Sequence, residues 1–151
     1  MDRFSDALNE MLVDIYQNVM RLEQQTIQKK NINLSINEMH MIEQIGKGGD
    51  AGLPVSEIAA KMNITRPSAT VAVNKLEKKG YVQKQNCEAD GRVVYVVLTR
   101  EGKKIDRFHS YYHRNMVREI SADLSEPEKE CLLKVMRKLD GYFIKSIGGK
   151  K

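Results

Sequence analysis

The chain has 151 residues, of which 30% are charged and 41% hydrophobic, a composition typical of one soluble domain built around its own core. Its net charge is +5, and the segment from Lys61 to Arg107 alone carries 11 basic and 5 acidic residues. Early acidic residues and the absence of any long apolar run argue against a signal peptide or a membrane span, so we expect a cytoplasmic protein without a membrane partner.

The first predicted element is a long amphipathic helix from Phe4 to about Lys29, where hydrophobic residues recur at spacings of three and four. A second helix is expected after Ser35 and Glu38, which form a capping-box pattern, and it ends at the glycines of residues 46–49. We assign residues 1–34 to a dimerisation helix.

Two short helices joined by a three-residue turn are predicted next. The first covers Val55–Met62, the turn is Asn63–Thr65, and the second helix runs from Arg66 to Lys79 with Thr65 as its N-cap. The small side chain of Ala59 allows the two helices to cross closely. This arrangement predicts a helix-turn-helix, whose second helix enters the major groove of DNA.

The outward face of the helix from Arg66 to Lys79 is predicted to carry polar or small side chains. Val71 is expected to pack inside with the other apolar residues. The residues assigned to this DNA-binding face are Arg66, Ser68, Ala69, Thr70, Asn74 and Lys75. Hydroxyl, amide and cationic groups can bond to base edges or phosphates, and Ala69 could contact a thymine methyl group.

A β-hairpin is predicted from the strands Tyr81–Lys84 and Val93–Leu98, with a polar tip from Gln85 to Arg92. Arg92 could enter a minor groove or hold a phosphate, and Asp90 could orient its guanidinium group through an ion pair. The helix from Arg66 to Lys79 and this wing complete a predicted DNA-binding lobe over residues 35–100.

Two further amphipathic helices are expected, one capped by Thr99 and one opened by the capping box Ser125 to Glu128. We assign residues 101–147 to dimerisation helices and 148–151 to a frayed tail, within one intertwined domain. The predicted fold is mainly α with a small β-wing. A single copy could not bury the apolar stripes of the first and last helices, so we expect a homodimer.

Several motifs together resemble the MarR family of winged-helix regulators. They are Val55-Ser-Glu-Ile-Ala59, Thr65-Arg-Pro-Ser-Ala-Thr70, Leu76-Glu-Lys-Lys-Gly-Tyr81, Asp90-Gly-Arg92 and Leu98-Thr-Arg-Glu-Gly102. The resemblance implies a homodimeric repressor that binds a pseudo-palindromic operator in double-stranded DNA. The segments 35–46 and 107–116 resemble the fatty-acid-synthesis repressor branch, which implies control by acylated acyl carrier protein.

Three histidines, His40, His109 and His113, are candidates for an effector pocket that takes a small molecule. The i, i+4 spacing of His109 and His113 is also a zinc-ligand spacing, and with His40 and Glu23 it would give four ligands, at positions similar to those of zinc-sensing family members. Zinc is the alternative here, since the main expectation is no metal and no cofactor.

Two other classes of function are disfavoured. The sequence has no phosphate-binding glycine loop and no recognisable catalytic triad, so we do not expect an enzyme. A winged helix used only for protein contact would have an acidic or apolar recognition face, whereas the predicted face here is basic and polar.

Overall fold

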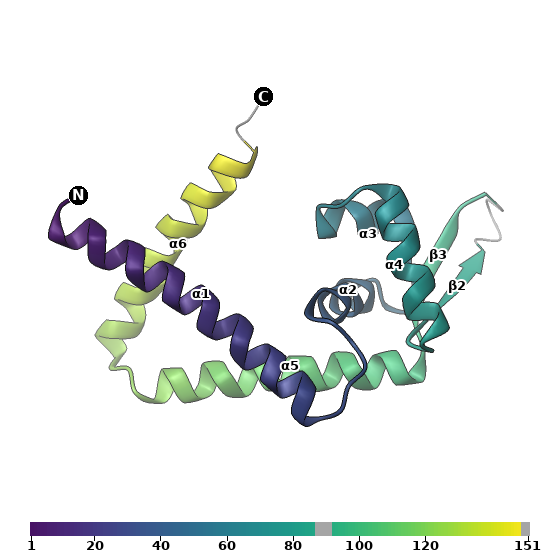
Figure 1. Cartoon of the computed structure of the whole chain (residues 1–151), viewed down its shortest axis with the longest axis horizontal. Helices are drawn as coiled ribbons and strands as arrows, with labels where there is room; N and C mark the ends of the chain where they lie inside the picture. The colour runs from purple at the N-terminus through teal and green to yellow at the C-terminus, as the bar shows by residue number, and fades with distance from the viewer. Residues whose placement is uncertain (87–91, 149–151) are drawn as a thin grey trace. The chain divides into compact units, whose positions relative to one another are not determined.

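The computed structural model describes residues 1–86 and 92–148, and it confirms a mainly α-helical fold with a small β-wing. In chain order the elements are α1 Arg3–Lys29, α2 Ile36–Lys47, the 3-10 turn Gly49–Ala51, β1 Leu53–Pro54, α3 Val55–Met62, α4 Arg66–Lys78, β2 Val82–Asn86, β3 Val94–Leu98, α5 Arg100–Ala122 and α6 Glu126–Gly148 (Figure 1). Contacts divide the chain into two compact units, Met1–His109 and Ser110–Lys151.

The predicted helix caps are present. The Ser35 hydroxyl accepts a hydrogen bond from the Glu38 amide, and the Glu38 carboxylate accepts one from the Ser35 amide, which closes the capping box of α2. Thr99 accepts from the Gly102 amide at the start of α5. Ser125 and Glu128 repeat the reciprocal pattern at α6. Each cap satisfies backbone amides that have no partner inside the helix.

The sheet has three strands in the order β1-β3-β2, whereas the sequence predicted only a hairpin. Leu53 pairs with Val96 and Pro54 with Tyr95, so the chain just before α3 is bonded to the wing. Two residues are too few to show the alternation by which a strand is recognised. β2 also extends to Asn86, beyond the predicted end at Lys84, because its ladder with β3 continues that far.

The core of the first unit lies where α2, α3, α4 and the sheet meet. Ile42, Ile45, Ile58, Leu76 and Val96 are completely buried there. The expectation that Val71 packs inside is wrong. Val71 is 58% exposed, and Val73 occupies the buried position instead, because the buried stripe of α4 runs through Ala69, Val73 and Leu76 at spacings of four and three.

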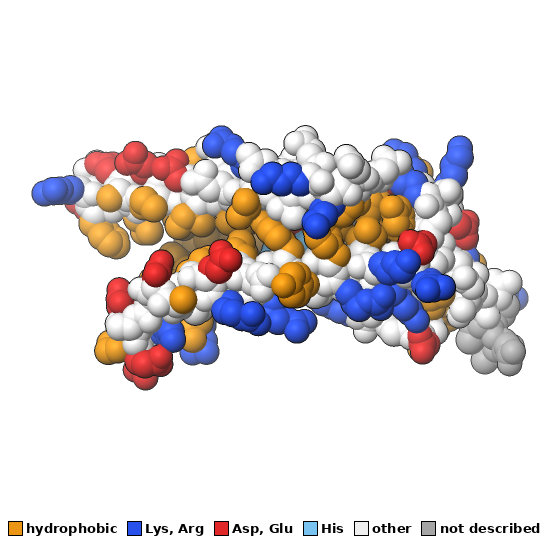
Figure 2. All heavy atoms as spheres, turned by 90° about the horizontal axis from the view of Figure 1, so that it is seen from below, with side chains coloured by type: hydrophobic (Ala, Val, Ile, Leu, Met, Phe, Trp, Pro, Cys, Tyr) orange, Lys and Arg blue, Asp and Glu red, His pale blue; other side chains and the backbone are white. Residues whose placement is uncertain are grey.

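The long helices keep many hydrophobic side chains exposed, and Figure 2 shows such side chains open to solvent on one face. On α1 they include Phe4, Met11, Ile15, Tyr16 and Leu22; in the second unit they include Val117, Ile120, Leu133, Met136, Phe143 and Ile144. Within the described residues, no helix combines the length and apolar character needed to cross a membrane.

Candidate nucleic-acid interface

The turn between α3 and α4 has the geometry expected of a helix-turn-helix. Asn63 ends α3 in the left-handed conformation (φ 54°, ψ 46°), which its short polar side chain tolerates. Thr65 then caps α4 by accepting a hydrogen bond from the Ser68 amide at 3.2 Å. Ala59 and Ala69 are both buried, and small side chains at a helix crossing allow the two backbones to approach closely.

Five of the predicted DNA-binding residues on α4 are exposed: Arg66, Ser68, Thr70, Asn74 and Lys75. Ala69 is not. Its side chain is fully buried on the same stripe as Val73 and Leu76, so the predicted contact with a thymine methyl group is wrong. Val71, by contrast, is an apolar residue that α4 exposes.

Hydrogen bonds within the protein determine which groups of these side chains remain available as donors or acceptors. The Thr65 hydroxyl donates to the Ser68 Oγ at 2.9 Å, so Ser68 can donate its own proton outward. The Thr70 hydroxyl donates to the Arg66 carbonyl at 3.0 Å. Lys84 on β2 donates to the Asn74 Oδ1. The contact between Lys84 and Asn74 could not be predicted from local sequence, because it joins two separate elements.

Arg66 and Arg92 line the same cleft, of about 280 Å³. Its other lining residues are Pro54, Val55, Ser56, Val93 and Val94. Two arginines, one at the start of α4 and one just before β3, therefore line one hollow. Asp90, predicted to orient Arg92, lies outside the described residues.

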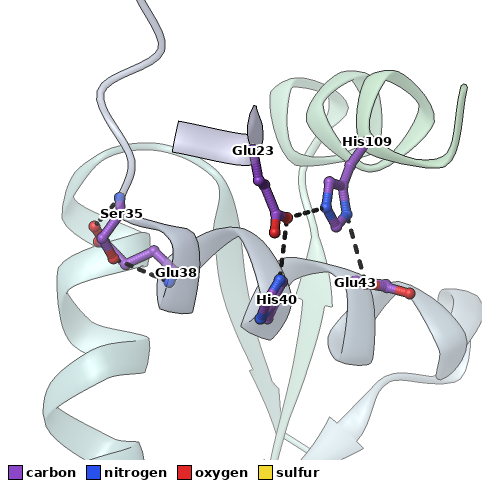
Figure 3. A network of polar contacts seen from close by, with 6 residues as sticks. All are labelled: Glu23, Ser35, Glu38, His40, Glu43 and His109. Atoms are coloured by element: carbon purple, nitrogen blue, oxygen red, sulfur yellow. Dashed lines mark hydrogen bonds and ion pairs between the residues drawn. The ribbon is translucent and has the colours of Figure 1, made fainter. Parts of the chain in front are cut away.

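A second polar site joins α1, α2 and α5 within the first unit, and Figure 3 shows its side chains turned toward one another. The Glu23 Oε1 lies 2.6 Å from the His109 Nε2 and 3.1 Å from the His40 Nε2. On the other side of its ring, the His109 Nδ1 lies 3.5 Å from the Glu43 Oε2. Glu23 and His109 are each only 3% exposed, and such burial is unusual for a glutamate.

The environment shifts the pKa values of two carboxyl groups near this site in opposite directions. Burial alone would raise the pKa of Glu23, but hydrogen bonds and charge from His109 and His40 outweigh it, so this pKa is lowered. Burial, reinforced by the charge of Glu43, raises the pKa of Asp106. Glu43 and Asp106 were missed in the sequence, since neither belongs to a recognisable motif.

The site contains three of the four predicted ligands. Ligand atoms of Glu23, His40 and His109 all lie within 4.8 Å of one another. His113 is in the second unit, so its place beside them remains a prediction.

Comparison with known proteins now identifies the family. A family model described as the MarR family matches residues 32–93. The HTH-type transcriptional regulator BilQ of Clostridium symbiosum is 30% identical over 114 residues, which cover 75% of this chain and 76% of BilQ. The chain belongs to the MarR family. The relatives that it matches are transcriptional regulators, the class of function predicted from the sequence.

A solved MarR-type structure also matches almost the full length. The crystal structure of Streptococcus pneumoniae FabT in complex with DNA has 32% identity and a TM-score of 0.89, covering 93% of this chain and 98% of that one. This match confirms the family and the branch predicted from the sequence. The HTH-type regulator YfiV of Bacillus subtilis is 32% identical over 100 residues, and the chain spans only 60% of the length of YfiV.

Proposed function

We propose that this MarR-family chain is a repressor that binds a pseudo-palindromic operator in double-stranded DNA as a homodimer. The observation that supports this most is the cleft shared by Arg66 and Arg92. A duplex lying against it would contact the start of α4 and the wing together. Arg66, Ser68, Thr70, Asn74 and Lys75 would enter the major groove, and Arg92 would contact a phosphate or the minor groove.

The exposed apolar faces support the homodimer. Phe4 is 73% exposed on α1, and Ile144 is 63% exposed on α6. Large apolar surfaces of this kind usually mark an interface, and a second copy of the chain offers matching surfaces. Two-fold symmetry would place the two recognition helices about one turn of DNA apart, roughly 34 Å.

Selection from a pool of random duplexes tests the proposal. The protein should enrich an inverted repeat whose half-sites are about 10 base pairs apart from centre to centre. Reporter transcription from a promoter carrying that repeat should fall when the protein is present. Enrichment of no sequence would contradict operator binding and favour a winged helix that contacts proteins only, and a rise in transcription would contradict repression.

The signal that we propose is acylated acyl carrier protein, in keeping with the branch of the family. The carrier is acidic, and Arg107, Arg114 and Arg118 supply positive charge along α5. Adding the acylated carrier should change the affinity of the protein for the selected duplex, while the carrier without its acyl chain should have little effect. An equal response to both forms would contradict acyl recognition.

Zinc is a second candidate signal, favoured by the Glu23, His40 and His109 site. Ligands at zinc distances of about 2.0–2.1 Å in a tetrahedron lie about 3.3 Å from one another. The 3.1 Å between the His40 Nε2 and the Glu23 Oε1 is close to this value, whereas the 2.6 Å between the His109 Nε2 and the Glu23 Oε1 would have to lengthen on binding. Two imidazoles and one carboxylate suit this metal, and His113 is the predicted fourth ligand. When bound, zinc would act as a structural tie between helices.

Metal analysis of protein purified without chelator tests this candidate. Zinc bound in a one-to-one ratio, and lost in His40→Ala, would support it. A metal-free protein whose His40→Ala variant retains the normal DNA affinity and zinc response would exclude that ligand.

A further inference from the structure

The position of Lys84 on β2 brings its ammonium group to α4. Lys84 pairs with Val96 and lies two residues after Val82, so both side chains are on the same face of the strand. Val82 is buried in the core, and β2 contacts α4. The Lys84 Nζ donates to the Asn74 Oδ1 and lies 3.6 Å from the Glu77 Oε1.

The chemistry of lysine fixes the orientation of the Asn74 amide. An ammonium group has three donors and no acceptor, so it can bond only to the oxygen of the amide. The NH₂ group of Asn74 must then point away from Lys84. Since Asn74 is exposed, its NH₂ group can donate to a ligand that covers α4.

This orientation matters for reading a base. A free asparagine contacts adenine through two bonds, donating to N7 and accepting from the N6 amino group. Guanine presents two acceptors, N7 and O6, at the same edge. The Lys84 ammonium occupies one of the two lone pairs of the Asn74 oxygen and places a positive charge beside it, which disfavours the approach of a second donor such as the adenine N6 amino group. An asparagine held in this way is therefore better matched to guanine than to adenine.

We propose that Lys84 is a specificity-determining residue, which holds Asn74 as a donor and makes it select guanine in the major groove. The proposal rests on the proposed function, in which α4 enters that groove. Lys84 acts through Asn74, so its loss should change which base is preferred and not only how tightly DNA binds.

The experiment selects binding sites from random duplexes with wild-type protein and with Lys84→Met. Wild-type protein should prefer guanine over adenine about tenfold at one position of each half-site. In Lys84→Met the amide can turn and pair with adenine, so the preference at that position should move toward adenine. Lys84→Gln, which can itself accept as well as donate, should give the same shift.

Lys78→Met is the matched control, because it removes the same charge from an exposed position on α4. It should weaken binding to all duplexes while keeping the guanine preference. Asn74→Ala should abolish the preference at that position. Melting temperatures of all variants show that the fold is retained.

Two outcomes separate this inference from the proposed function. An unchanged guanine preference in Lys84→Met and Lys84→Gln would overturn the role of Lys84 and leave operator binding intact. Failure of the wild-type protein to enrich any sequence would overturn the proposed function and this inference with it.

Discussion

Glu23 on α1 and His109 on α5 are 86 residues apart in sequence, yet their Oε1 and Nε2 atoms lie 2.6 Å apart with almost no access to solvent. His40 on α2 contacts the same oxygen. A buried carboxylate is costly unless it is paired, and breaking such a pair leaves the remaining partner without compensation. Three helices of the first unit therefore depend on one another through this site.

The Glu23 carboxylate should make stability depend on pH. The pKa of Glu23 is lowered in the folded state. Its contribution to the free energy of unfolding is therefore fully present above its ordinary pKa of 4.5, and it is lost as the pH falls through the pKa of the folded state. Glu23→Gln should lower the free energy of unfolding at pH 7 by about 1–3 kcal/mol and flatten its dependence on pH in the acid range. Denaturant unfolding measures both.

Glu10→Gln, which makes the same change at an exposed position of α1, is the control and should change little. Equal effects of the two substitutions would show that the buried pair does not stabilise the fold.

The ionised carboxylate of Asp106 should lower stability, whereas that of Glu23 raises it. The pKa of Asp106 is raised in the folded state, mainly by burial, so its charged form costs stability once the pH has risen from its ordinary pKa of 3.8 through the folded value. Asp106→Asn should raise the melting temperature at pH 7, and the gain should vanish below the ordinary pKa. A variant that is less stable at pH 7 would show that its attraction to His109 and Lys47 outweighs burial.

Ala69 and Val71 should respond to substitution in opposite ways. Ala69 is fully buried, so Ala69→Leu should overpack the core and cost about 1–3 kcal/mol of stability. Val71 is exposed, and Val71→Thr should change stability by less than about 0.5 kcal/mol. Thermal unfolding compares the two. A severe loss from Val71→Thr would place that side chain in the core after all.

Arg66 and Arg92 should each contribute to the salt dependence of DNA binding if they contact phosphates. Arg92→Ala should weaken binding at matched salt and reduce the slope of log K against log salt by about 0.9. Arg66→Ala should do the same if it contacts a phosphate, and should instead reduce selectivity among duplexes if it contacts a base. Unchanged affinity in Arg92→Ala would remove the wing from the mechanism.

Charge on the apolar face of α6 should disrupt the proposed homodimer. Ile144 is exposed in the single chain, so Ile144→Lys should leave each copy folded but would place a charge in the buried interface. Sedimentation equilibrium should show a dimer for the wild type and weaker association for the variant. A wild-type monomer at micromolar concentration would contradict the proposed assembly.

Local signals in the sequence predicted the helices well. The caps at Ser35 and Ser125 are predicted from a glutamate three positions later, and the cap at Thr65 from its own residue type, so no knowledge of the fold is needed to place them. The burial of Ala69 was missed because small residues suit either side of a helix. Contacts such as Lys84 with Asn74 and His109 with Glu43 were also missed, since side chains from separate elements meet only after folding.

Strand β1 has a mechanical consequence. Leu53 and Pro54 pair with β3 directly before α3 begins, so backbone hydrogen bonds join the wing to the helix that braces α4. These bonds favour movement of α3, α4 and the wing as one unit, so in the proposed function the spacing between α4 and the wing would be set before DNA binds. In the proposed homodimer, a signal would therefore act by changing the distance between the two DNA-binding lobes and would leave the structure of each lobe unchanged.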